Sequence, residues 1–82
     1  MPETNSERVI RVIAATQKLA AERVSEESTF RELGIDSLDG LNIVFALEEE
    51  FAVDIPDEAV KEFTSVRDVV AGIDRLLALK DA

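Results

Sequence analysis

The sequence predicts an all-α protein, a small four-helix bundle of three longer helices and one short helix, with a long loop between the first and second helices. Apolar residues recur at helical spacing in several segments, and no segment alternates apolar and polar residues as a half-buried strand does. Helix-starting motifs precede these segments. The 82 residues, 46% of them hydrophobic, suit one domain, which we assign to residues 1–82.

The first helix is expected to run from about residue 5 to residue 18. Thr4 and Glu7 have the spacing of a capping box, in which two side chains accept hydrogen bonds from each other's backbone N–H groups. The apolar residues that follow recur at roughly helical spacing: Val9, Val12, Ile13 and Leu19.

Residues 20–36 lack this period and are expected to form the long loop, with a short helical turn near residues 30–33. The apolar residues that we expect to anchor the loop are Val24, Phe30, Leu33 and Ile35. Loops of this length are uncommon in compact domains and often carry function, so this loop is a candidate functional segment.

The second helix is expected to begin near Ser37, in the segment LGIDSLDGL, with Asp36 as its N-cap. At about 100° per residue, one side carries Gly40 and four large apolar residues: Ile43, Val44, Leu47 and Phe51. The opposite side carries Leu38, Leu41, Phe45, Asn42, Glu48 and Glu49. Because this side runs into two glutamates, we expect it to face solvent and form a docking patch. The alternative is that Leu41 or Phe45 closes over the loop as core.

Gly40 is unusual in this position, because glycine inside a helix costs about 1 kcal/mol relative to alanine. Its place on the inward side has two explanations. Close packing against a neighbouring helix is the commoner one, and room for a group to enter the core is the other.

Two further helices are expected near the C-terminus. Pro56 fits the first helical position, with two acidic residues after it, and begins a brief helix to about residue 63. Ser65 and Asp68 then mark the start of the last helix. The apolar residues of this helix form one stripe: Val66, Val69, Val70, Ile73, Leu76 and Leu77.

The negative charge is confined to the middle of the chain. Between Glu32 and Val60 there are nine acidic residues and no Lys or Arg, while the rest of the chain carries nine acidic and nine basic residues. This segment repels nucleic acid and attracts a basic protein surface in a salt-dependent way. The alternative is a face that only keeps the protein in solution, but a block of one sign around a distinctive serine favours a partner surface.

The composition excludes several classes of function. The chain has no histidine, the commonest general base and metal ligand, and no cysteine, so disulfides and thiolate metal sites are absent. We therefore expect no catalytic residues, no metal site and no enzymatic activity. No apolar run is long enough to span a membrane, and the MPETNSER opening does not look like a secretory signal, so a cytoplasmic location is expected.

Ser37 is the distinctive residue of this segment. A serine at a helix start is most often local structure, and as a nucleophile Ser37 lacks a histidine partner and the G-x-S-x-G motif. A phosphate-linked group fits better, because free N–H groups and the helix dipole favour an anion there. Asp36 and Asp39 partly offset this attraction.

The residues GIDSLDGLNIVFALEEEF, followed by IPDE, resemble the acyl carrier protein family, and the similarity covers roughly residues 6–79. The D-S-L triplet alone is common, but D-S-L-D, ALEEEF and IPDE at these separations form a specific combination. The resemblance implies that Ser37 is esterified by 4′-phosphopantetheine, transferred from coenzyme A by a phosphopantetheinyl transferase. The thiol of this arm would carry acyl intermediates as thioesters for enzymes of fatty-acid, specialised lipid or polyketide synthesis.

The resemblance also implies roles for other residues. Partner enzymes with basic patches would dock on Asp36, Leu38, Asp39, Leu41, Phe45, Glu48 and Glu49. The candidates for sheltering the acyl chain, each of which is otherwise an ordinary core residue, are Ile43, Val44, Leu47, Phe51, Ile55, Ala59 and Phe63. Such a carrier is expected to be a monomer, without nucleic acid and without membrane insertion.

The chain departs from the pattern D-S-L-D-T-V-E-L-V-M that is common among housekeeping fatty-acid carriers. It has Gly40, Leu41, Asn42, Ile43 and Phe45, with one acid fewer and one aromatic more on the presumed docking face. The partners and the cargo therefore stay open, with a specialised lipid, a polyketide or an aminoacyl intermediate all compatible. The competing hypothesis is an acidic helical interaction protein, an inhibitor or nucleic-acid mimic, without a prosthetic group.

Overall fold

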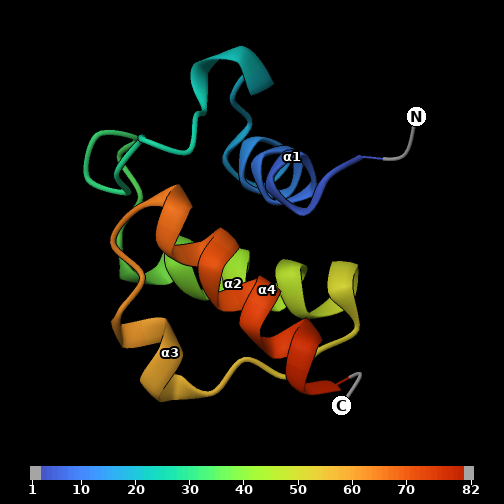
Figure 1. The fold of residues 1–82 in the computed structure, drawn as a ribbon. Helices are drawn as coiled ribbons and strands as arrows, with labels where there is room; N and C mark the ends of the chain where they lie inside the picture. Colours follow the sequence, from blue (N-terminus) through green and yellow to red (C-terminus); the bar gives the residue numbers. More distant parts are fainter. Residues whose placement is uncertain (1–2, 81–82) are drawn as a thin grey trace.

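The computed structural model describes residues 3–80 and confirms the all-α prediction. Its elements are α1 (Asn5–Gln17), a short 3-10 helix η1 (Ala21–Arg23), α2 (Ser37–Phe51), α3 (Asp57–Lys61) and α4 (Val66–Lys80). Figure 1 shows α1 on one side of α4 and the short α3 on the other. Three longer helices and one short helix are therefore present, with the expected long connection between α1 and α2.

The start of α1 is fixed by the predicted capping box. The Thr4 hydroxyl oxygen accepts a hydrogen bond from the Glu7 N–H at 3.1 Å, and the Thr4 N–H donates to the Glu7 carboxylate at 3.0 Å. The helix ends one residue earlier than expected, because Lys18 adopts a left-handed conformation with φ of 56°. Its N–H still bonds to the Ala15 carbonyl, which satisfies one of the free groups at the helix end.

One hydrophobic core joins α1, α2 and α4. Helix α1 packs against both of the other two. The side chains larger than that of alanine with no more than a few per cent of their surface exposed are Val9, Ile13, Val24, Ile43, Leu47, Phe51, Val66, Val69 and Ile73. All belong to the apolar positions predicted from helical spacing or as loop anchors. Burial of one such side chain contributes about 1.5 to 3 kcal/mol, so this layer supplies the main driving force for folding.

The long loop is held against the start of α4. Thr29 and Ser65 form an isolated antiparallel bridge, in which the Phe30 N–H donates to the Thr64 carbonyl and the Val66 N–H to the Ser28 carbonyl, both at 3.0 Å. The expected turn at residues 30–33 is present as a hydrogen-bonded turn. It ends at Gly34, whose φ of 72° suits glycine, and the chain then enters α2. The loop therefore positions the residues just before Ser37.

The boundaries of the last two helices differ slightly from the prediction. Pro56 is the N-cap of α3 and not its first residue, because its ψ of 151° is extended, and the helix stops at Lys61. Helix α4 starts as predicted: the Ser65 hydroxyl oxygen accepts from the Asp68 N–H at 3.3 Å, and the Ser65 N–H donates to the Asp68 carboxylate at 3.2 Å. The same carboxylate also accepts two hydrogen bonds from Thr64.

Candidate functional site

Ser37 is the first residue of α2, and it is exposed. Asp36 is the N-cap: its carboxylate accepts from the Asp39 N–H at 2.9 Å, while the Asp36 N–H points to the Asp39 carboxylate at 3.5 Å. Within residues 3–80, no hydrogen bond occupies the Ser37 hydroxyl. The capping hydrogen bonds are made by the side chains of Asp36 and Asp39, so they fix the backbone at the helix start and leave the Ser37 oxygen available.

The first turn of α2 is suited to an anionic group on Ser37, with one opposing feature. The N–H groups of Ser37 and Leu38 make no hydrogen bond within the described residues, and the positive end of the helix dipole lies at the same place. The carboxylates of Asp36 and Asp39 oppose a phosphate there. Their mutual capping bonds use part of their hydrogen-bonding capacity without removing their charge.

An apolar cavity of about 450 Å³ opens beside Ser37. Four of the seven predicted shelter residues line it: Ile43, Val44, Leu47 and Phe63. Phe51 and Ile55 lie in the core outside this cavity, and Ala59 lines a different groove. The sequence pattern did not identify the remaining apolar wall. Leu41 comes from α2 itself, although the helical spacing placed it on the outward side, and the other residues come from the loop and from other helices: Phe30, Ile35, Val60 and Val69.

Gly40 lies in the wall of this cavity, one turn after Ser37. A Cβ atom added to Gly40 would meet no heavy atom of a neighbouring element within 4 Å. The commoner explanation, close helix packing, is therefore wrong for this glycine. The missing side chain instead leaves space between the serine and the apolar interior.

The outward side of α2 carries the large hydrophobic residues that the helical spacing placed there. Leu38, Leu41 and Phe45 are 72%, 48% and 60% exposed. The alternative in which Leu41 or Phe45 closes over the loop as core is therefore wrong. Exposed apolar groups this large and this close together are typical of a binding surface.

The acids of this side differ in what they contact. Asp36 and Glu49 are exposed, and Asp39 is half-buried in the cap. Glu48 is half-buried, and its carboxylate accepts a hydrogen bond from the Ile55 N–H at 2.9 Å. Glu48 thus holds the chain that follows α2 as well as adding charge to the surface.

One acid of the negative block is paired with basic residues of α1 at the partly exposed edge of the core. Glu50 pairs with Arg8 at 3.0 Å and with Arg11 at 2.9 Å, and the hydrogen bonds from these guanidinium groups lower the pKa of its carboxyl group. Arg8 also lies over the Phe51 ring at 4.3 Å. No other acid of the block forms an ion pair within residues 3–80, so its outward side keeps a negative field.

The residues present therefore fit a prosthetic group joined through phosphate. An exposed hydroxyl, two free N–H groups and an apolar cavity meet at one helix start.

Among residues 3–80, no helix has the length and apolar character needed to cross a membrane.

Comparison with known proteins points the same way. A family model described as a phosphopantetheine attachment site matches residues 7–73. A mitochondrial acyl carrier protein of Dictyostelium discoideum is 41% identical over 66 residues, which cover 80% of this chain and 55% of that protein. A putative mitochondrial acyl carrier protein of Schizosaccharomyces pombe is 40% identical over 70 residues, which cover 83% of this chain and 62% of that protein.

Two consequences follow from these relatives. The chain spans less than two thirds of the length of each. The prediction of a cytoplasmic location is wrong, because both relatives are named as mitochondrial proteins. That prediction rested on the default for a chain without a recognisable signal, which is not positive evidence for any compartment.

Proposed function

The chain belongs to the acyl carrier protein family, and from this premise we propose that it is a non-catalytic carrier that holds acyl groups on 4′-phosphopantetheine attached to Ser37. The observation that carries the proposal is the exposed hydroxyl of Ser37, which makes no hydrogen bond to any described residue and lies at the mouth of an apolar cavity. The competing hypothesis, an acidic protein without a prosthetic group, explains neither this cavity nor the family match.

The prosthetic group supplies a thiol that carries an acyl group as a thioester, in a chain that has no cysteine of its own. The residues of the chain itself attach and position this group. Ser37 provides the oxygen for the phosphodiester bond, and the N–H groups of Ser37 and Leu38 favour its negative charge. The cap formed by Asp36 and Asp39 holds this turn in place without using the serine.

Partner enzymes dock, in this proposal, on the outward side of α2. Leu38, Leu41 and Phe45 provide the apolar contact, and the acidic residues that attract a basic patch are Asp36, Asp39, Glu48 and Glu49. Charge of one sign raises the association rate and makes it depend on salt, while apolar contact adds specificity. These partners include a phosphopantetheinyl transferase and enzymes that act on acyl groups.

The cavity beside Ser37 is the proposed shelter for the acyl chain. Its walls are mainly apolar, and Gly40 leaves its mouth open toward the attachment point. Burying an alkyl chain in this cavity is favourable by about 0.8 kcal/mol for each methylene group removed from water. The acyl groups are intermediates of fatty-acid synthesis or of a specialised lipid or polyketide pathway.

The proposal is tested by incubating the chain with coenzyme A and a broad-specificity phosphopantetheinyl transferase, and measuring its intact mass. We expect one added phosphopantetheine group in the native chain and none in Ser37→Ala. Ser25→Ala is the matched control, because Ser25 is also an exposed serine but lies outside the cavity and should leave modification unchanged. Absence of the group from the native chain, or its persistence in Ser37→Ala, rejects the proposal.

A further inference from the structure

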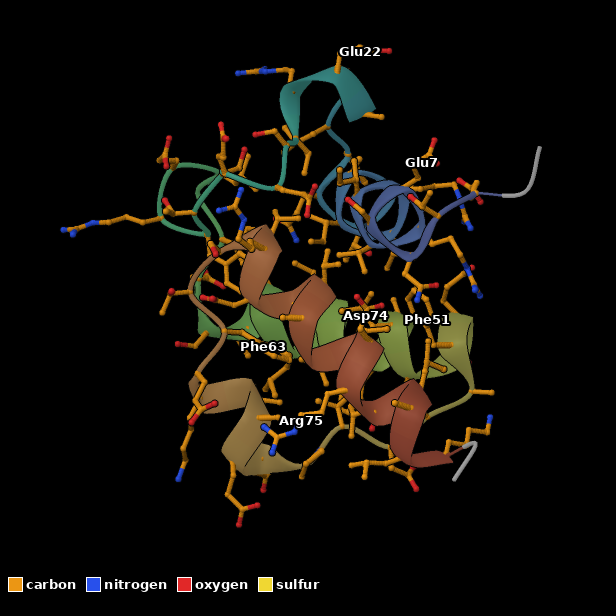
Figure 2. The ribbon with its side chains drawn as sticks, in the orientation of Figure 1. Glu7, Glu22, Phe51, Phe63, Asp74 and Arg75 are labelled. Carbon is orange, nitrogen blue, oxygen red and sulfur yellow. The ribbon has the colours of Figure 1, made fainter. Side chains whose placement is uncertain are left out.

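A second groove shares the Phe63 side chain with the cavity beside Ser37. It has a volume of about 580 Å³ and runs between α3 and α4, where its apolar wall includes Ala59, Leu76 and Leu79. Of the described residues, Phe63 alone lines both hollows. Figure 2 shows Phe63 between α3 and α4, as a separating wall requires.

The Phe63 ring rests on the backbone of α4 at Gly72. A Cβ atom at Gly72 would lie 2.8 Å from Cε1 and 3.0 Å from Cζ of the ring, distances too short for ordinary contact. Glycine therefore lets the ring approach closer to α4 than any other residue would allow. The ring that lines both hollows is therefore seated directly against α4.

Phe63 lies just after α3, which is itself weakly held. Helix α3 has five residues, and no side chain caps its N-terminus. Within residues 3–80, no side-chain hydrogen bond or ion pair joins α3 to another helix, and its apolar contacts with the core come from Ala59 and Val60. A helix this short has little stability alone, so its position depends on these contacts and on Phe63.

We infer that Phe63, seated on Gly72, is the stop that sets the length of acyl chain the cavity shelters. This inference rests on the proposed carrier function and adds a specificity-determining residue to it. A methylene group occupies roughly the 30 Å³ of a water molecule, so the cavity holds on the order of ten carbon atoms when its open mouth is discounted. The ring keeps the carbon atoms of a longer chain out of the α3–α4 groove.

The test compares chains loaded with hexanoyl, decanoyl and hexadecanoyl groups by transferase from the corresponding acyl-coenzyme A. The measurement is Tm by circular dichroism. In the native chain, we expect Tm to rise from hexanoyl to decanoyl and then to level off. In Phe63→Leu, which leaves an apolar side chain in place, the hexadecanoyl form should exceed the decanoyl form by roughly 5 °C, the effect of sheltering one or two more methylene groups.

Leu77→Ala is the matched control. Leu77 is half-buried against the same core but lines neither hollow. Leu77→Ala should therefore lower Tm for every acyl group, and Tm should still level off at the decanoyl form. Phe63→Ala should extend the rise like Phe63→Leu, and the NMR signal of the Gly72 amide should lose its ring-current shift in both variants.

The outcomes separate the two proposals. If the native chain cannot be loaded at all, the carrier function fails. If loading succeeds but Tm levels off at the same length in the native chain and in both Phe63 variants, Phe63 is not the stop and the carrier function stands.

Discussion

Alanine at Gly40 should make the unmodified protein more stable, although glycine is the native residue. Gly40 has ordinary helical backbone and does not need the conformational freedom of glycine. Replacing glycine by alanine inside a helix gains about 0.5 to 1 kcal/mol, and the added methyl group meets nothing within 4 Å, so no steric cost offsets this gain. In a domain of this size, the gain corresponds to a rise in Tm of roughly 2 to 8 °C.

Gly72→Ala is the matched comparison, because it makes the same change in α4 with the opposite surroundings. Its Cβ atom would lie 2.8 Å from the Phe63 ring, and overpacking of this kind costs about 1 to 3 kcal/mol, more than the helical gain. Thermal unfolding followed by circular dichroism should therefore show a higher Tm for Gly40→Ala and a lower Tm for Gly72→Ala. A lower Tm for Gly40→Ala would refute the assignment of open space to Gly40, and a higher Tm for Gly72→Ala would refute the close contact between the Phe63 ring and α4.

Three further predictions follow from the site and the caps. Ser37→Ala should change the free energy of unfolding by no more than about 0.5 kcal/mol in urea titration, because the hydroxyl forms no hydrogen bond with the part of the chain that the structure describes; a larger loss would show a structural role. Glu49→Lys should slow association with a partner enzyme mainly at low salt in stopped-flow measurements, because Glu49 is exposed and unpaired within residues 3–80, and a salt-independent effect would contradict electrostatic docking. Asp68→Asn should lower stability by about 1 kcal/mol at neutral pH. The hydrogen bonds from Thr64 lower the pKa of Asp68 in the folded state, so its contribution is present above the unfolded pKa of about 3.8 and is lost as pH falls through the folded value. If the difference in the free energy of unfolding between the native chain and Asp68→Asn stays constant from pH 7 to roughly pH 2, the stabilising role of the ionised Asp68 carboxylate is refuted.

The helices could be predicted because their starts are encoded locally. Thr4 with Glu7, and Ser65 with Asp68, form capping pairs whose partners are three residues apart, so the sequence contains both halves of each interaction. Asp36 could be predicted as an N-cap from its residue type before a helix, whereas its reciprocal pairing with Asp39 is seen only in the structure. Pro56 was placed one position too far inside α3, because proline tolerates either position.

The cavity could be predicted only in part, because its walls come from distant segments. The inward side of α2, which follows from the helical period alone, includes Ile43, Val44 and Leu47, and these three residues line the cavity. Phe30 and Ile35 reach the cavity from the long loop, and no local pattern shows where a loop residue will pack. Phe51 and Ile55 are buried as expected for apolar residues, but against other parts of the core.

The central claim is that Ser37 carries the prosthetic group, and the most direct test is the mass of the peptide that contains Ser37, from protein purified from its native source. We expect this peptide to carry phosphopantetheine, alone or with an acyl group, and fragmentation to place the group on the Ser37 oxygen. A native population in which the Ser37 peptide is entirely unmodified would contradict it.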